Sequence, residues 1–572
     1  MRVRVFIQIL LIGLTFLIVG LFYTQVVRYD EYRIMSEGNR LRVTPLTAPR
    51  GSIFDRHGNI LAKDALSFNA SVIYSQIRDK NALAKLLSEI LEIDKNKIDK
   101  GIDKCRRRPY SPVYVVSDIG TKAAIQLEEA AYEYPGLFVE ATTKREYVDG
   151  ESMASVLGYI GRINRPEFDR LKHYGYQIND MIGRAGLEKQ YDNYLRGKHG
   201  GKQVEVDNRG REVATIGYRE PIPGRNIHTT LDLDLQKFCN KLLKDKRGAI
   251  VAMDPQTGKI LAMASAPSYD PEIFVDRKRS GEIKALLANK LYPLMNRAIS
   301  GAYPPGSIFK LVVAVAALES GKATPETESI CEGYITLGKR AFRCWKKTGH
   351  GKQTMTDAIK NSCNVYFYRL GLLVGADNIA AFARKFGFGK FTKIDLPGEV
   401  EGSVPSPQWK EKTLKQQWYK GETVNFAIGQ GYLLVTPIQI SGMMSVFANS
   451  GYLVRPYVVE FIGDVRVNSF EKQPAGIRDI AIDTVREGTR KCVNGHHGTG
   501  MKARLPDVIV SGKTGTAQTS TGRDHGWFVG FAPIDNPELV VVVFDEFGGK
   551  GGYYAAETAG KVFREARKLK II

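Results

Sequence analysis

The stretch that decides the fold is Tyr303-Pro304-Pro305-Gly306-Ser307-Ile308-Phe309-Lys310, which runs into the apolar residues 311–318. The prolines and the glycine end a loop, and the apolar run is long enough to predict a buried helix from this point. Residues three apart on a helix share a face, so we expect the amine of Lys310 beside the hydroxyl of Ser307. A serine hydroxyl is a poor nucleophile at neutral pH until a nearby base takes its proton. The stretch therefore predicts a serine nucleophile served by a lysine base.

Two short signals further along the chain complete this pattern. They read Ser362-Cys363-Asn364 and Lys513-Thr514-Gly515-Thr516. The first provides a second hydroxyl and a side-chain amide, and the second provides another cation after a strand-like stretch at 508–510. S-x-x-K, S-x-N and K-T-G in this order resemble the motifs of the penicillin-binding and serine β-lactamase group.

Each signal taken alone is weak, because the chain repeats all three elsewhere. Residues 469–472 also read S-x-x-K, 67–69 read S-x-N and 347–349 read K-T-G. The first of these runs into Pro474, where a helix cannot continue, and the last lies in a predicted loop. A P-loop interpretation of Lys513 fails, because Asp507 stands where the first glycine is required. Context therefore favours the ordered set.

The N-terminal segment is apolar almost without interruption from Val5 to Val27. As a helix it would be roughly 35 Å long at about 1.5 Å per residue, which is enough to cross a bilayer. No small-x-small cleavage site follows, so we expect an uncleaved single anchor rather than a removed signal peptide. Arg2 and Arg4 favour a cytoplasmic N-terminus, with the chain after Arg28 outside. A buried core helix is the alternative.

The chain carries a formal net charge of +21, from 82 basic and 61 acidic residues. This charge fits anionic lipid headgroups or an anionic polymer outside the membrane. A nucleic-acid-binding protein would concentrate its basic residues in a recognition motif, whereas here they are dispersed. We therefore expect no nucleic-acid partner.

The part after the anchor is too long for one ordinary domain, because chains split beyond about 250–300 residues. We expect a non-catalytic α+β pedestal at 28–230. Its predicted elements are a hairpin at 50–62 that turns at His57-Gly58-Asn59, helices at 79–104 and 122–134, and a strand pair around 203–211.

The catalytic domain is expected at 231–572. A helix starts within 231–236, and strands at 248–254 and 259–264 precede the nucleophile helix. Three further strand-like segments, 506–518, 525–532 and 538–545, follow a helical middle section. Strands at both ends with helices between them predict one sheet whose N- and C-terminal strands pair. The K-T-G strand would then lie beside the serine helix.

Over essentially its whole length the chain resembles the class B penicillin-binding proteins, which are peptidoglycan D,D-transpeptidases. Outside the catalytic motifs the resemblance rests on 50–62 and on Val204-Glu205-Val206-Asp207-Asn208-Arg209-Gly210-Arg211. The second stretch and the length are similar to the penicillin-binding protein 2 group of cell elongation; the division-specific paralogue shares the catalytic motifs. The resemblance implies a cytoplasmic tail at 1–4, an anchor at 5–27, a dimerisation-type pedestal, and a transpeptidase domain with helices around an antiparallel sheet. We see no glycan-polymerase signature, so we assign no polymerase activity.

The resemblance also implies a role for each motif residue. Ser307 would attack the carbonyl of the penultimate D-Ala of a stem peptide, and Lys310, kept uncharged by burial and by Lys513, would be its base. An amine of a neighbouring stem peptide would then resolve the acyl-enzyme, and β-lactams would acylate Ser307 as mimics of D-Ala-D-Ala. The remaining implied roles are a proton relay by Ser362, a hold on the peptide amide by Asn364, contacts to the terminal carboxylate and substrate strand by Lys513, Thr514, Gly515 and Thr516, and an oxyanion hole from the N–H groups of Ser307 and Thr516.

Three of the six cysteines lie near the nucleophile in the sequence: Cys331, Cys344 and Cys363, with His350 between the last two. Three sulfurs and one imidazole suit tetrahedral zinc. Some relatives in the resembled group carry a metal at corresponding positions, with carboxylates in place of two of these sulfurs. The alternatives are a Cys331–Cys344 disulfide, natural in an oxidising compartment, and free thiols. Catalysis is expected to need no cofactor, so zinc would be structural. The other cysteines, Cys105, Cys239 and Cys492, are expected to be unpaired thiols.

Other activities on the same scaffold remain open at this point. They are a D,D-carboxypeptidase, a β-lactam-hydrolysing enzyme and a penicillin-binding sensor. A long pedestal behind an anchor favours the transpeptidase over a small secreted β-lactamase, and a sensor would carry further membrane helices and a cytoplasmic signalling domain.

The resemblance also implies a location and partners. It places the chain in the cytoplasmic (inner) membrane as a single-pass protein, with the N-terminus inside and the bulk periplasmic or extracellular. The implied partners are stem peptides, β-lactams, inner-membrane lipid, a SEDS-family glycan polymerase and other membrane proteins of the elongation complex.

Overall fold

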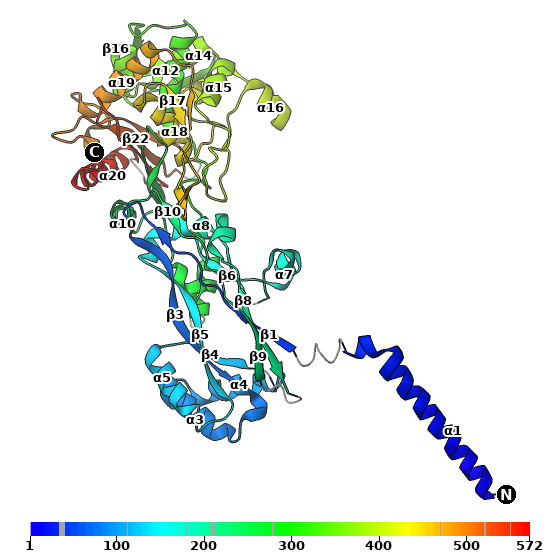
Figure 1. Ribbon diagram of the computed structural model, residues 1–572. Coiled ribbons are helices and arrows are strands. Elements are labelled where there is room, and N and C mark those ends of the chain that lie inside the picture. Colours follow the sequence, from blue (N-terminus) through cyan, green and yellow to red (C-terminus); the bar gives the residue numbers. More distant parts are fainter. Residues whose placement is uncertain are drawn as a thin grey trace. The chain divides into compact units, whose positions relative to one another are not determined.

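The structure is a computed structural model that describes residues 2–33, 41–110, 112–178, 180–207, 212–276, 279–469, 471–519, 522–548 and 551–572. Residue contacts divide the chain into two compact units. The first comprises Met1–Arg50, Asp64–Lys144 and Arg196–Gly224, and the second comprises Gly51–Lys63, Arg145–Leu195 and Arg225–Ile572 (Figure 1). The expected domain boundary at 230/231 stays a prediction.

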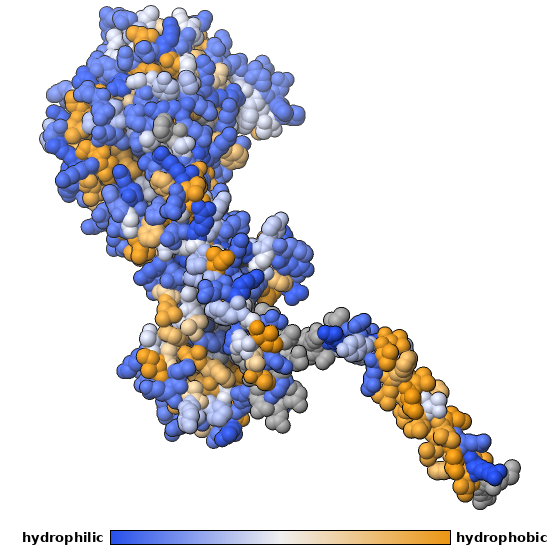
Figure 2. All heavy atoms as spheres, viewed as in Figure 1, coloured by the Kyte–Doolittle hydropathy of each residue, from blue (hydrophilic) through white to orange (hydrophobic). Residues whose placement is uncertain are grey.

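The N-terminal segment is helical, as expected from its composition. Helix α1 (Arg2–Phe22) continues into the short π-helical turn η1 (Tyr23–Val27). Over Val3–Val27 this helix is long and apolar enough to cross a membrane. Hydrophobic side chains cover its surface in Figure 2, which is what a lipid-facing helix requires.

The first unit packs helices against strands around a small core of its own, which includes Val72, Leu83, Leu87, Ile102 and Leu127. The predicted helix at 79–104 is two helices, because Glu92 adopts a left-handed conformation with φ 53° and Asp94 caps the second helix. The predicted strand pair near 203–211 is confirmed as β8 and β9, which with β1 form a three-stranded antiparallel sheet. The predicted turn at 208–211 lies outside the described residues. The elements are β1 (Leu41–Leu46), η2 (Tyr74–Gln76), α3 (Lys80–Leu91), α4 (Lys95–Cys105), β4 (Val113–Ile119), α5 (Thr121–Ala130), β8 (Gly200–Val206), β9 (Glu212–Arg219), and most of β3 (Ile60–Val72) and β5 (Leu137–Tyr147).

The second unit begins with the predicted hairpin. Strand β2 (Ile53–Phe54) pairs antiparallel with the start of β3, and the Asp55 carboxylate closes the turn by accepting the N–H groups of His57 and Asn59, each at 2.8 Å. Further along, Arg145 and Glu188 form a fully buried ion pair at 2.7 Å. The elements between are α6 (Gly150–Leu157), β6 (Ile160–Arg162), α7 (Arg165–Leu171), η3 (Lys172–Tyr174), β7 (Met181–Gly183), α8 (Gly186–Gln190) and α9 (Asp192–Leu195).

The catalytic part of this unit is built on one five-stranded sheet with the order β12-β11-β23-β22-β21. Every neighbouring pair is antiparallel, so the predicted pairing of N- and C-terminal strands is confirmed. The strands are β11 (Gly248–Met253), β12 (Ile260–Ala266), β21 (Ser511–Ala517), β22 (His525–Ala532) and β23 (Leu539–Asp545). The strand expected from residue 506 starts only at Ser511. Pro506 lacks an N–H for a ladder, and Asp507 instead pairs with Arg567.

Both faces of the sheet are covered, which explains its nearly continuous apolar strands. Alternate residues of each strand point to opposite faces. Ile250, Val541 and Phe528 pack with helices α10 (Leu233–Leu242) and α20 (Gly551–Lys568). Val251 and Val542 pack on the other side with α12 (Lys310–Glu319), α14 (Asn364–Val374) and α18 (Pro437–Ala448). The nucleophile segment is therefore held against one face of a rigid sheet.

The remaining elements surround this core. They are β10 (Ile227–Thr229), η4 (Pro271–Phe274), α11 (Ser280–Ala288), η6 (Gly306–Phe309), β13 (Ser329–Cys331), β14 (Tyr334–Leu337), β15 (Arg340–Arg343), β16 (Gly351–Gln353), α13 (Met355–Lys360), α15 (Ala376–Lys385), α16 (Pro407–Leu414), α17 (Lys420–Phe426), β17 (Tyr452–Val454), β18 (Val459–Ile462), β19 (Val465–Arg466), β20 (Lys472–Pro474), α19 (Asp479–Asn494) and η7 (Met501–Ala503).

Candidate active site

Ser307 lies on the 3-10 turn η6, directly before the buried helix α12. Gly306 has a φ of +55°, and a side chain there would meet the carbonyl oxygen of Thr516 at 2.4 Å. Only glycine therefore lets the nucleophile turn approach strand β21 this closely. The N–H of Gly306 donates to the carbonyl oxygen of Gly429 at 3.0 Å. The turn is thus fixed between β21 and the loop at 429.

The amine of Lys310 is completely buried and contacts the S-x-N motif. It donates to the carbonyl oxygen of Ser362 at 2.8 Å and to Oδ1 of Asn364 at 2.7 Å, and it lies 3.3 Å from Oγ of Ser362. Burial, and then the positive charge of Lys513, lower the pKa of Lys310 to about 7. Near neutral pH much of this amine is uncharged and can accept a proton.

The hydroxyl of Ser307 makes no hydrogen bond to Lys310 or to any other residue that the structure describes. Catalytic hydrogen bonds in free enzymes are often long and tighten only when substrate binds. In this structure the Lys310 amine therefore bonds to Ser362 and Asn364, and the predicted contact between this amine and the Ser307 hydroxyl is not formed.

Ser362 occupies a tight turn between helices α13 and α14, with a φ of 51°. This left-handed conformation is uncommon for a residue other than glycine. The N–H of Ser362 donates to the carbonyl oxygen of Ile359 at 3.2 Å, and the next N–H donates to that of Ala358 at 2.9 Å. Backbone strain of this kind persists only where the surroundings enforce it. Here it presents both oxygens of Ser362 to Lys310.

The K-T-G motif lies on β21, the edge strand of the sheet. Lys513 is fully buried, its amine donates to the carbonyl oxygen of Thr514 at 2.9 Å, and burial lowers its pKa. A side chain at Gly515 would meet the carbonyl oxygen of Pro305 at 2.8 Å. Thr516 is exposed. The motif therefore contacts the nucleophile turn through its backbone and leaves Thr516 open to a ligand.

Trp345 supports the S-x-N turn, although no sequence signal marked it. Its indole N–H lies 3.1 Å from the carbonyl oxygen of Asn361 and 3.2 Å from that of Ser362. The Ser362 carbonyl thus accepts from both Trp345 and Lys310. The ring is 58 % exposed and packs edge-on against His350 at 5.2 Å. Only its position next to Cys344 could have drawn attention to it.

Thr499 connects two of the motifs and was also missed. Its hydroxyl accepts from the Thr514 hydroxyl at 3.1 Å, lies 3.2 Å from Sγ of Cys492, and donates to the carbonyl oxygen of Lys360 at 3.3 Å. Lys360 ends helix α13, two residues before Ser362. One hydroxyl with one donor and two acceptor positions thereby joins the K-T-G strand to the S-x-N turn. Thr514 faces Thr499, and its hydroxyl is not free in this structure.

Cys331, Cys344, His350 and Cys363 converge next to the S-x-N turn, with their ligand atoms within 4.8 Å of one another. Nδ1 of His350 lies 3.6 Å from Sγ of Cys331 and 3.5 Å from Sγ of Cys344. A hydrogen bond between the thiols of Cys344 and Cys363 lowers the pKa of Cys344 and raises the pKa of Cys363. All six cysteines, each within the described residues, are free thiols, so the alternative disulfide is not formed.

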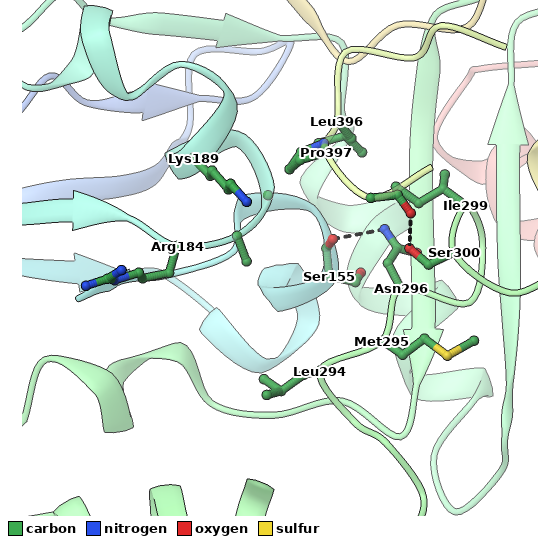
Figure 3. Close-up of a pocket in the computed structure, with 13 residues that line it drawn as sticks. Ser155, Arg184, Lys189, Leu294, Met295, Asn296, Ile299, Ser300, Leu396 and Pro397 are labelled. Carbon is green, nitrogen blue, oxygen red and sulfur yellow. Dashed lines mark hydrogen bonds between the residues drawn. The ribbon is translucent and has the colours of Figure 1, made fainter. Parts of the chain in front are cut away.

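A pocket of about 210 Å³ lies in the same unit and contains none of the predicted catalytic residues (Figure 3). Ser155, Lys189, Asn296, Ser300 and Pro397 are among its lining residues. Its polar side chains are partly paired already: Asn296 donates to the carbonyl oxygen of Ser155 at 2.9 Å, and Ser300 donates to that of Gly398 at 2.6 Å. This pocket is therefore separate from the motif cluster.

Comparison with known families matches nearly the whole chain. The profile described as the penicillin-binding protein transpeptidase domain covers residues 248–567. The profile described as the penicillin-binding protein dimerisation domain covers residues 45–229.

Curated and solved relatives cover similar lengths. The Haemophilus influenzae protein named peptidoglycan D,D-transpeptidase MrdA is 35% identical over 97% of this chain and 89% of its own. Penicillin-binding protein PBP2 of Helicobacter pylori, solved in complex with MreC, is 28% identical, with a TM-score of 0.81 over 93% of this chain and 100% of that one. A structure described as a peptidoglycan synthase complex that coordinates polymerisation and cross-linking contains a chain 34% identical, with a TM-score of 0.76 over 98% of this chain and 97% of that one.

We predict that Thr499→Val slows acylation by a labelled penicillin about fivefold, because Thr514 and Lys360 lose the hydroxyl that joins them and a hydrogen bond contributes about 1 kcal/mol. The loss should fall on the acylation step rather than on initial binding, as read from the concentration dependence of the labelling rate.

Thr499→Ser should restore the rate, since it keeps the hydroxyl. Thr484→Val is the matched control, because that hydroxyl only caps the carbonyl oxygen of Ile480 within α19, at 2.6 Å. Equal losses in Thr499→Val and Thr484→Val would show that Thr499 has a merely structural role.

Proposed function

This chain belongs to the class B penicillin-binding proteins, and we propose that it is a serine D,D-transpeptidase that cross-links peptidoglycan stem peptides during cell-wall elongation. The observation that carries the proposal is the buried amine of Lys310, bonded to Ser362 and Asn364 and with a pKa lowered to about 7. An amine that loses its charge near neutral pH is the base a serine nucleophile needs when no histidine serves it.

Ser307 is proposed as the nucleophile, attacking the carbonyl carbon of the penultimate D-Ala. The hydroxyl proton passes to Lys310 as the bond to carbon forms. The backbone N–H groups of Ser307 and Thr516 stabilise the negative oxygen, and the contact between Gly306 and Thr516 supports this placement. Each such donor contributes about 3–4 kcal/mol to the lowering of the barrier.

Collapse of this intermediate breaks the peptide bond and releases D-Ala. Ser362, at 3.3 Å from the Lys310 amine, relays the proton to the departing nitrogen. Asn364 holds the peptide amide of the donor strand. Lys513, Gly515 and Thr516 face the terminal carboxylate, to which the buried cation of Lys513 is attracted. The hydroxyl of Thr514, also expected to face the carboxylate, donates to Thr499 instead. An amine of a second stem peptide then attacks the acyl-enzyme and restores Ser307.

The transpeptidase domain, proposed at 231–572, would work outside the cytoplasmic membrane, carried by a pedestal at 28–230. Helix α1 would cross the membrane once, with Arg2 and Arg4 on the cytoplasmic side. The relatives solved with MreC and in a peptidoglycan synthase complex support partners of the same kind here, including a SEDS-family glycan polymerase. Contact would be through the anchor and the pedestal.

Zinc is proposed as a structural ion at Cys331, Cys344, His350 and Cys363. A tetrahedral site with bonds of about 2.3 Å to sulfur and about 2.1 Å to nitrogen separates those atoms by roughly 3.6 Å. The His350–cysteine distances of 3.6 and 3.5 Å fit this geometry. When bound, the ion would cross-link the segments around Cys331 and Cys344 to Cys363, the N-cap residue of α14. Catalysis itself needs only the side chains described above.

The direct test of the proposed function is covalent capture of a labelled penicillin by the full-length protein in detergent, followed by cross-linking of nascent glycan. Ser307→Ala should abolish capture, and Lys310→Arg, whose guanidinium keeps its proton near neutral pH and cannot act as a base, should slow it at least ~100-fold. Capture that survives Ser307→Ala would refute the proposed chemistry, and release of D-Ala without any cross-link would indicate a carboxypeptidase.

The pKa of Lys310 predicts how acylation depends on pH. The uncharged amine is the active form, so the rate should rise with pH, reach half its maximum near pH 7, and level off above it. A base with the ordinary lysine pKa would instead give a rate that still climbs about tenfold per unit at pH 9. The rate of penicillin labelling between pH 5.5 and 9 separates the two.

Elemental analysis tests the metal. The purified, reduced protein should contain about one zinc per chain, and Cys331→Ser should lower the content and the melting temperature. Cys105→Ser is the control, because that thiol lies in the core of the first unit. A metal-free protein with unchanged melting and acylation would exclude the ion.

A further inference from the structure

Residues 407–432 carry three aromatic rings that gather around one lysine. The ring centres of Trp409 and Tyr432 lie 5.5 Å apart. The amine of Lys410 lies 5.4 Å from the ring centre of Tyr419 and 5.9 Å from that of Tyr432. We refer to Trp409, Lys410, Tyr419 and Tyr432 as the aromatic platform. Helix α16, which provides the first two, stands out from the catalytic unit in Figure 1.

Hydrogen bonds hold the Lys410 amine and the backbone of Tyr419 in place. Lys410 is only 3 % exposed, and its amine donates to Oε1 of Glu422 at 2.5 Å and to the carbonyl oxygen of Gln417 at 2.9 Å. The other oxygen of Glu422 accepts the N–H of Tyr419 at 2.8 Å. The backbone that carries the Tyr419 ring is therefore ordered before a ligand arrives, which lowers the entropy lost on binding.

These rings are not needed for the core. Tyr419 is 63 % exposed and Tyr432 is 38 % exposed. An aromatic ring offers an apolar face and a polar rim, which suits a ligand with both kinds of surface. Lys412, Lys415 and Lys420 surround the platform in the sequence and are exposed. The surface therefore favours a ligand that has apolar faces and carries negative charge.

The platform is continuous with the catalytic centre. Tyr432 lies three residues after Gly429 in the sequence. The carbonyl oxygen of Gly429 accepts the N–H of Gly306, the residue before Ser307. The ring of Trp418 packs edge-on against Phe426, with ring centres 6.2 Å apart. Phe426 in turn stacks on Phe309 of the turn that carries Ser307, with ring centres 5.2 Å apart. A ligand chain that reaches from Ser307 across residues 429–432 would meet the platform.

We propose that the aromatic platform binds the sugars of a peptidoglycan strand while one of its stem peptides occupies the catalytic cleft. The apolar C–H faces of the sugars stack on Tyr419 and Tyr432, and the exposed lysines attract the carboxylates of neighbouring stem peptides. This inference rests on the proposed function, because it assigns to the same substrate a second contact beyond the peptide.

The test compares two ligands on the full-length protein in detergent: uncross-linked glycan strands that carry stem peptides, and the free stem peptide. The double variant Tyr419→Ala/Tyr432→Ala should lower strand affinity about tenfold, because both ring faces are lost, and should leave free-peptide affinity unchanged. Tyr419→Phe/Tyr432→Phe keeps both ring faces and should bind the strand normally, which also shows that the fold tolerates change here.

Tyr452→Ala is the matched control, because this tyrosine is 41 % exposed and also lies near a lysine, with the Lys472 amine 5.9 Å from its ring centre. Equal affinity for the glycan strand in the alanine double variant and in this control would overturn the proposal. A double variant that binds acidic peptides more weakly but binds the glycan strand normally would also overturn it. Penicillin capture by the unaltered protein is scored separately. No penicillin capture would refute the proposed function. Normal capture together with unchanged strand affinity in the alanine double variant would refute only this inference.

Discussion

The burial of the Lys310 amine is the constraint on which the rest of this site depends. A lysine that loses contact with water and faces a second buried cation, Lys513, releases its proton far below the usual pKa. This arrangement costs stability. Between pH 7 and the ordinary lysine pKa of about 10.5 the unfolded chain holds a proton that the folded chain does not, so stability rises with pH across that window and is lower at neutral pH. The core that surrounds α12 offsets this cost.

Several backbone features serve that buried amine. The left-handed turn at Ser362 directs its hydroxyl and carbonyl oxygens toward Lys310, and the indole N–H of Trp345 donates to the same carbonyl. Gly306 lets the nucleophile turn touch β21. Thr499 joins that strand to the end of helix α13. The three motifs are distant in sequence, yet each is fixed to another by a specific contact. Such preorganisation keeps catalytic groups in place without moving when substrate arrives.

The sequence predicted the parts of this structure that follow local rules. Strand alternation and apolar runs located β11, β12, β22 and β23, and the turn at His57-Gly58-Asn59 marked the first hairpin. The three motifs predicted a common site, and the structure places them together. Local rules could not find Thr499 or Trp345, because a hydroxyl or an indole gains its role only from neighbours that folding brings near. Nor could they locate the start of β21, where Asp507 pairs with Arg567 of a helix far along the chain.

The central claim is that Lys310 is uncharged at the pH at which the protein works. Competitive labelling of the full-length protein with an amine-reactive anhydride, with the modified peptide quantified by mass spectrometry across pH, measures that proton directly. Lys310 should show a reactivity midpoint near pH 7, far below the ordinary lysine pKa of about 10.4. A midpoint for Lys310 near that ordinary lysine value would contradict the claim.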